Sequence, residues 1–199
     1  MVDTILVTGA IGTVGSEVVR QLSKVTKGIV RAAIYAPNKI DTLKQIVNQS
    51  IEFVNLDYLG WKTVQALANV QKIFLVTTPL PNSVDIVSKL VKEAKNNGIK
   101  YIVKLSVMNS DAQPGYAMGK LHRQEKKIIE ESKKPHTFLR PTSFMQNFVN
   151  YLVKPKEIKM FSTLTFGYVK ICFVNVRKCT RHCDYGSQDT YFRWGPIYL

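Results

Sequence analysis

The stretch from Ile5 to Gly15 limits what this chain can fold into more than any other. It reads ILVTGAIGTVG, a short apolar run followed by three glycines at three-residue spacing and the start of a helical pattern. Gly9 lets the chain leave a strand in a conformation closed to most residues. Gly12 leaves room for a phosphate beside the backbone, and Gly15 allows close packing of the helix on the strand. This order predicts a dinucleotide-binding turn, with an ordinary tight loop as the alternative.

The pattern GxxGxxG differs by one residue from the dinucleotide fingerprint GxGxxG. The turn nevertheless places free N–H groups at the positive end of a helix, where the phosphates of a dinucleotide would bind. We therefore expect the cofactor-binding residues of this turn to be Thr8, Gly9, Gly12, Thr13, Val14 and Gly15.

The position about 20 residues beyond the glycines distinguishes the two nicotinamide dinucleotides. A carboxylate there would bind the ribose 2′-hydroxyl of NAD, whereas a basic residue would suit the 2′-phosphate of NADP. This chain has Tyr35 at that position and Arg31 nearby. Tyr35 is placed to cover the adenine or the ribose, and Arg31 favours NADP over NAD. The alternative for Arg31 is a strand residue with a solvated tip.

Strand-like and helical segments alternate along most of the chain. The expected strands cover residues 4–8, 29–35, 51–56, 72–77, 101–107 and 137–139. The expected helices cover residues 14–25, 41–49, 59–70, 83–97 and 116–132. Buried strands that alternate with amphipathic helices predict an α/β fold, a doubly wound parallel sheet.

The net charge of +14 raises the question of a nucleic-acid partner. The densest basic stretch, residues 120–134, is interleaved with three glutamates, as on a solvated helix face. The chain has no aromatic–basic repeat of the kind that stacks bases. We therefore predict a generic basic surface and no specific nucleic-acid partner.

The sequence also shows no pattern typical of a membrane span or a secretion signal. No apolar run approaches the roughly 20 residues of a membrane span, and the chain enters its first strand without a charged leader. Its three cysteines all lie after residue 170 and form no disulfide framework. These features predict a cytoplasmic protein without a membrane partner.

Five segments carry a resemblance to a known family. They are VTGA with the glycines that follow, FVNLD at 53–57, FLVTTP at 74–79, YIVKLS at 101–106 and TFLRPTSFMQN at 137–147. Through them the chain resembles the NmrA-like group of atypical short-chain dehydrogenases/reductases, from residue 4 to about residue 152. The resemblance implies an NAD(P)-binding Rossmann domain over residues 1–152 and reduction of small electrophilic acceptors of the quinone or azo type.

The resemblance also implies cofactor contacts beyond the glycine turn. Asp57 would accept a hydrogen bond from the adenine amino group, with a turn or helix-cap carboxylate as the alternative. Thr77 and Thr78 would line the cofactor near its nicotinamide half. Ser106 would face the nicotinamide ribose.

Candidate catalytic residues fall on the predicted helix 116–132. Tyr116 and Lys120 have the YxxxK spacing that puts both on one helix face, where the ammonium would lower the pKa of the phenol. In short-chain dehydrogenases such a pair is the catalytic acid and its partner. Many NmrA-like proteins instead keep a Lys or His about one turn later, which makes His122 the second candidate. Solvated helix residues are the alternative for all three.

The resemblance decays after residue 152. Residues 167–177 are similar to a family strand, with Asn175 in place of the usual aspartate. Cys179, His182 and Cys183 follow, but a tetrahedral metal site needs a fourth ligand, for which only Cys172 remains. We expect no metal site, and interpret residues 153–199 as a divergent, truncated or frameshifted remnant of the region that covers the substrate.

Two function classes therefore stay open. One is an NAD(P)H-dependent reductase of a quinone-like or aromatic substrate. The other is a non-catalytic, redox-sensing NAD(P)-binding regulator that acts through a partner protein, a reading that the degraded tail favours. A homo-oligomer is compatible with both.

Overall fold

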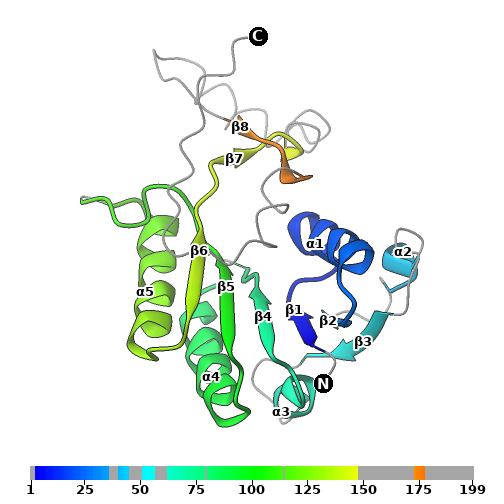
Figure 1. The fold of residues 1–199 in the computed structure, drawn as a ribbon. Helices are drawn as coiled ribbons and strands as arrows, with labels where there is room; N and C mark the ends of the chain where they lie inside the picture. The colour runs from blue at the N-terminus through cyan, green and yellow to red at the C-terminus, as the bar shows by residue number, and fades with distance from the viewer. Residues whose placement is uncertain are drawn as a thin grey trace.

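A parallel sheet with the strand order β3-β2-β1-β4-β5-β6 forms the centre of the molecule (Figure 1). The computed structural model describes residues 3–35, 40–44, 51–56, 62–78, 80–113, 115–147 and 173–177. The strands of this sheet are β1 (Thr4–Val7), β2 (Ile29–Ile34), β3 (Ile51–Asn55), β4 (Lys72–Leu75), β5 (Tyr101–Leu105) and β6 (His136–Leu139). The helices are α1 (Thr13–Val25), α2 (Ile40–Lys44), α3 (Lys62–Leu67), α4 (Ser83–Asn96) and α5 (Ala117–Glu131).

The strand order confirms the predicted doubly wound α/β fold. The chain runs outward from β1 to β3, returns to the other side of β1 with β4, and then runs outward to β6. All five neighbouring pairs are parallel. The order reverses between β1 and β4, and ligands of such sheets bind beyond the carboxyl ends of the strands at this point.

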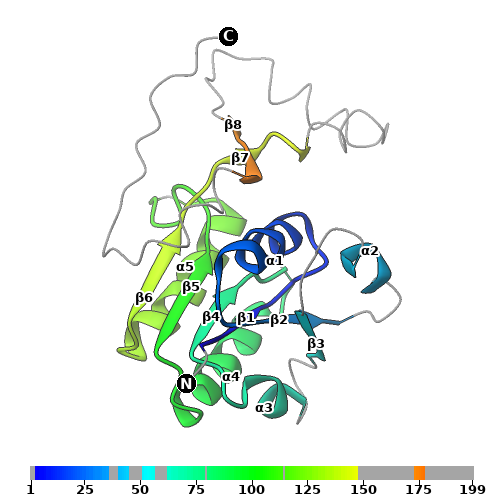
Figure 2. The ribbon, with the colours of Figure 1, turned by 45° about the vertical axis from the view of Figure 1, so that its right-hand side comes forward.

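Side chains that alternate along the strands build one core on each face of the sheet. Leu6 packs into the cluster formed with α3, α4 and α5, while the next residue, Val7, packs into the cluster formed with α1 and α2. Ile73 and Phe74 divide in the same way. The two groups of helices lie on opposite sides of the sheet (Figure 2). This period of two explains why the strands are buried on both faces.

Several strands and helices end earlier in the structure than the sequence predicts. The strands expected over 72–77 and 101–107 end at Leu75 and Leu105. The helix expected over 59–70 is described over Lys62–Leu67, and the backbone then reverses at Asn69, whose φ is +60°. Residues 45–49 of the expected helix 41–49 and the boundary at residue 152 lie outside the described residues.

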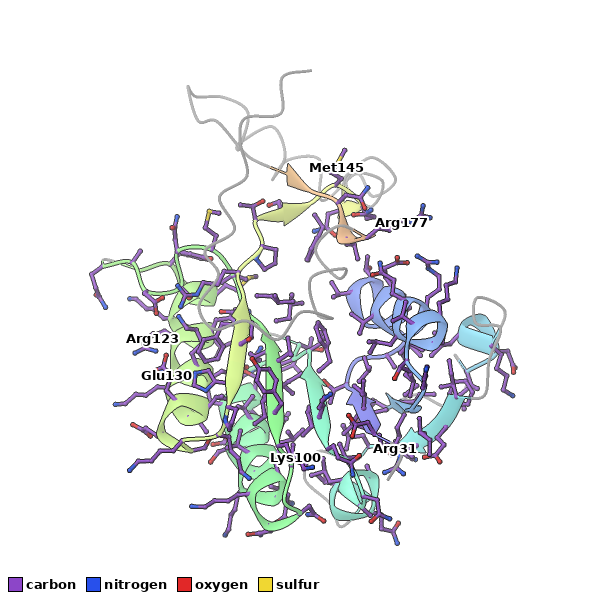
Figure 3. The ribbon with its side chains drawn as sticks, viewed as in Figure 1. Arg31, Lys100, Arg123, Glu130, Met145 and Arg177 are labelled. Carbon is purple, nitrogen blue, oxygen red and sulfur yellow. The ribbon has the colours of Figure 1, made fainter. Side chains whose placement is uncertain are left out.

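A short second sheet joins the tail to the main fold. Its strands β7 (Ser143–Phe144) and β8 (Phe173–Val174) are parallel. The Gln146 side chain accepts a hydrogen bond from Val176 N at 3.2 Å and donates one to Asn175 Oδ1 at 3.3 Å. Gln21 of α1 donates to the Arg177 carbonyl at 3.1 Å. Residues 173–177 therefore lie near α1, as the position of Arg177 in Figure 3 shows.

The rest of the tail lies outside the described residues, including Cys172, Cys179, His182 and Cys183. The expectations of a degenerate tail and of no metal site there are not addressed by the structure. Within the described ranges, no helix has the length and apolar character that a membrane crossing requires.

Candidate functional site

Two glycines of the turn, Gly9 and Gly15, have the geometry that the sequence predicts. Gly9 has φ +60°, a left-handed conformation that disfavours a side chain. A Cβ on Gly15 would lie 2.1 Å from the Gly9 carbonyl oxygen, so α1 packs on the turn only because Gly15 has no side chain. Gly12 N donates to the same Gly9 oxygen at 2.9 Å. The turn therefore holds α1 directly beyond the carboxyl end of β1.

The amino end of α1 is available to an anion. Gly12 caps the helix without a side-chain hydrogen bond, and the first turn contains no acidic residue. Gly12 and Thr13 are exposed, whereas Val14 and Gly15 are buried. The positive helix end thus faces outward with no carboxylate of its first turn to neutralise it, which fits a bound phosphate.

Thr8 has a structural role within this turn. Its buried hydroxyl donates to the Val76 carbonyl and accepts from Val76 N, both at 2.8 Å. These bonds fasten the carboxyl end of β1 to that of β4 and fix the point where the strand order reverses. A direct cofactor contact by the Thr8 hydroxyl stays a prediction.

Arg31 is placed differently from the expectation. Its guanidinium contacts Glu52 Oε2 at 2.8 Å and donates to the Ala66 and Ala68 carbonyls at 2.9 and 2.7 Å. These carbonyls lie at the carboxyl end of α3, which leads into the amino end of β4, so the Arg31 guanidinium points toward the edge of the sheet opposite the glycine turn. Figure 3 shows Arg31 beside α3. The prediction that Arg31 favours NADP is therefore wrong, because Glu52 and the carbonyls at the end of α3 bind its guanidinium.

The adenine side of the expected site is described only in part. Tyr35 follows the carboxyl end of β2 and is 75% exposed, on the same edge of the sheet as the glycine turn. Asp57 lies outside the described residues, and its expected contact with adenine stays a prediction.

Polar side chains at the carboxyl ends of β4 and β5 form the other half of the site. These strands are neighbours, so Thr77 and Ser106 lie at the same edge of the sheet. Ser106 is buried, and its hydroxyl has no hydrogen-bond partner among the described residues. Thr78 is exposed. Their expected contacts with the nicotinamide half of a cofactor stay predictions.

Thr77 belongs to a buried ionic network that the sequence did not predict. Lys104 Nζ on β5 lies 2.9 Å from Glu125 Oε2 on α5, and both side chains are almost fully buried. The same ammonium donates to Thr77 Oγ1 at 2.9 Å and to the Leu105 carbonyl at 2.6 Å. Thr77 in turn donates to Glu125 Oε2 at 3.1 Å.

His122 completes this network. Its Nδ1 lies 3.3 Å from Glu125 Oε2, a separation within hydrogen-bond range although the alignment falls short of a formed bond. About a tenth of the His122 side chain is exposed. Among the candidate acids, His122 is therefore the one joined to the buried charges beneath the edge of the sheet.

The charges of the network stabilise one another. Burial alone would raise the pKa of Glu125, but His122 and Lys104 together outweigh it and lower that pKa to about 2. Burial lowers the pKa of Lys104, and the Glu125 carboxylate opposes this effect. We infer an ionised pair at neutral pH, since Glu125 compensates for the burial of Lys104, and His122 and Lys104 together compensate for the burial of Glu125.

Tyr116 and Lys120 do not form the expected couple in this structure. The Tyr116 hydroxyl donates to the Met108 carbonyl at 2.9 Å, and partial burial raises the pKa of the phenol. Tyr116 and Lys120 both lie in the described part of the chain, and no hydrogen bond links the hydroxyl to the ammonium. Lys120 is exposed. A catalytic role for this pair stays a prediction.

Comparison with known proteins agrees with this geometry. The model of the NmrA-like family matches residues 1–168 of the 199 in the chain. The chain belongs to the NmrA-like family. An NAD(P)H azoreductase from Xenophilus azovorans is 29% identical over 177 residues, which are 87% of this chain and 59% of that protein.

Solved structures share the fold of this NmrA-like chain. The NADPH-dependent quinone oxidoreductase of Escherichia coli, solved with NADPH, has a TM-score of 0.67 and 24% identity over 79% of this chain and 54% of its own. A Citrobacter sp. triphenylmethane reductase, solved with NADP(H), has a TM-score of 0.72 and 21% identity over 90% of this chain and 64% of its own. The chain thus spans less than two thirds of these relatives.

A second charged cluster corrects the interpretation of α5 as a solvated face. Lys126 is buried, and its Nζ lies 2.6 Å from Asp111 Oδ2 in the loop that follows β5. Arg123 and Arg140 lie 3.3 and 3.4 Å from the same carboxylate. Glu125 and Lys126 are adjacent yet both buried, because each pairs with a residue far away in sequence. The only signal in the sequence was Lys104 itself, a charge inside an otherwise apolar strand.

Proposed function

We propose that this NmrA-like protein binds a nicotinamide dinucleotide and transfers a hydride from it to a small electrophilic acceptor of the quinone or azo type. The observation that carries the proposal is the glycine turn, which holds the uncompensated positive end of α1 at the carboxyl edge of β1. The named activities and cofactors of the azoreductase, the quinone oxidoreductase and the triphenylmethane reductase support it.

The proposed cofactor contacts follow the edge of the sheet. The N–H groups of Thr13 and Val14 would hold the pyrophosphate, since that of Gly12 is bonded to the Gly9 carbonyl. Tyr35 would cover the adenosine end, where Asp57 is also expected. Thr77, Thr78 and Ser106 would lie at the nicotinamide end. The dinucleotide supplies the hydride, while the protein orients it. Because the Arg31 guanidinium points away from the proposed site, the preference for NADP rests on the relatives solved with that cofactor.

Exposed apolar side chains fit an acceptor that is flat and poorly hydrated. Leu80 follows β4, Met108 follows β5, and Tyr116 and Met118 begin α5, so all four belong to the carboxyl edge of the sheet. Each is between 42% and 49% exposed. Methionine and tyrosine contact aromatic ligands favourably, which supports an aromatic acceptor.

Titration of the full chain with NADPH and with NADH, followed by nicotinamide fluorescence, tests this proposal. We expect both to bind and NADPH to bind more tightly. Oxidation of bound NADPH by members of a quinone and azo-dye panel would support the reductase. Binding without oxidation of any acceptor would instead favour the redox-sensing regulator, and no binding of either dinucleotide would contradict both.

A further inference from the structure

We propose that Lys104 and Glu125 are positioning residues that orient His122, and that His122 gives the proton that accompanies hydride transfer. This inference rests on the proposed reductase function. It gives the buried Lys104–Glu125 pair a positioning role and identifies His122, rather than Tyr116, as the proton donor.

The fold brings these three residues together from two elements. His122 and Glu125 are three residues apart on α5, so both point to the same side of the helix. Lys104 reaches them from β5, and Thr77 adds a hydrogen bond from beyond β4. The cluster therefore lies where β4 and β5 end, under the edge that the dinucleotide would cover.

Glu125 uses its two oxygens unequally. Oε2 contacts Lys104, Thr77 and His122, while Oε1 is buried without a hydrogen-bond partner in the described part of the chain. The carboxylate is thus held by one oxygen, and its rotation is restricted by Lys104. A carboxylate fixed in this way selects the tautomer and the ring orientation of a neighbouring histidine.

Stability alone does not explain the pair. Well-packed apolar residues often replace a buried ion pair without loss of stability, since removing two charges from water costs as much as their attraction returns. Lys126 of the same helix forms another ion pair, with Asp111 of the loop after β5, but Asp111 is 45% exposed and its ion-pair partners among the described residues include no candidate acid. The Lys104–Glu125 pair differs because both members are buried and one of them contacts His122.

The chemistry balances with the dinucleotide as reductant. A bound dihydronicotinamide would supply the hydride to the acceptor, which would gain two electrons as the dinucleotide is oxidised to NAD(P)⁺. The acceptor atom that gains negative charge takes the Nε2 proton of protonated His122. The neutral ring keeps its Nδ1 proton on the side that faces Glu125 Oε2, 3.3 Å away, and later takes a proton from solvent.

The tautomer of His122 in the cofactor-free protein tests the positioning role directly. The chain has three histidines, so ¹⁵N-detected imidazole spectra are simple, and His122→Gln identifies the signal by its loss. We expect the neutral ring to carry its proton on Nδ1, and Glu125→Gln to shift it towards the Nε2–H tautomer. An Nε2–H ring in the wild type, or an unchanged tautomer in Glu125→Gln, would overturn the proposal.

A double substitution separates positioning from stability. Lys104→Met with Glu125→Gln removes both charges and keeps their volumes. We expect a folded protein with an unchanged NADPH Kd and KM, and a kcat lower by about 10- to 100-fold, the loss seen when the partner that orients a metal-bound histidine is removed. Lys126→Met with Asp111→Asn is the matched control and should keep its kcat.

Single substitutions identify the acid. We expect His122→Gln to lower kcat by about 10²–10⁴-fold, the usual contribution of a general acid, and to lower it more than Tyr116→Phe does. Unchanged kcat in the double Lys104/Glu125 variant, or the opposite order for His122 and Tyr116, would overturn the proposal. If the wild type binds no dinucleotide, the proposed function fails, while the tautomer still reports separately on Glu125 and His122.

Discussion

At the scale of single residues, Gly15 of the glycine turn and Gly98 are needed for different reasons. Gly15 has no room for a side chain, because a Cβ would meet the Gly9 carbonyl at 2.1 Å. Gly98, just beyond α4, has φ +68° and nothing within 4 Å of its Cβ position. One glycine is required by packing and the other by backbone conformation alone.

This difference predicts unequal losses of stability. Gly15→Ala forces α1 away from the turn, and we expect it to lower the free energy of unfolding by at least about 3 kcal/mol, the upper end for overpacked sites. Gly98→Ala should cost about 1–2 kcal/mol, the strain of a left-handed residue. Urea unfolding of both variants measures the difference. Equal losses would contradict the close packing described for Gly15.

At the scale of elements, the Lys104–Glu125 pair joins α5 to β5 and makes their association depend on pH. The folded-state pKa of Glu125 is about 2, against an ordinary value of 4.5. Its contribution to stability is therefore complete above about pH 4.5 and is lost as the pH falls towards 2. One pKa unit corresponds to about 1.36 kcal/mol, so this shift contributes about 3 kcal/mol to the free energy of unfolding.

Urea unfolding between pH 6 and pH 3 tests this linkage. We expect the wild type to lose more stability over this range than the variant with Lys104→Met and Glu125→Gln. Glu17 and Asp111, whose pKa values are also lowered by their cationic partners, are present in both proteins and cancel in the comparison. Parallel stability curves for the two proteins would show that His122 and Lys104 do not hold Glu125 as an anion.

At the scale of the whole molecule, the parts that local pattern determines could be predicted from the sequence. Periodicity predicted the alternating strands and helices, and the glycine spacing predicted the turn beyond β1. Charge partners could not be predicted, because they depend on which strands become neighbours. Arg31 meets Glu52 only because β2 and β3 pair, and Lys104 meets Glu125 only because α5 packs back onto β5. The errors at Arg31 and on α5 have this common cause.

The most direct measurement of the central claim is calorimetric titration of NADPH into Thr13→Glu, with Thr13→Gln as the control. Thr13 is exposed in the first turn of α1, so a carboxylate there should stabilise the helix by about 0.3–1 kcal/mol and repel a bound pyrophosphate. We predict that Thr13→Gln binds NADPH like the wild type and that Thr13→Glu binds at least about tenfold more weakly, a loss of about 1.4 kcal/mol or more. Equal affinities in the two variants would contradict a phosphate site at the glycine turn.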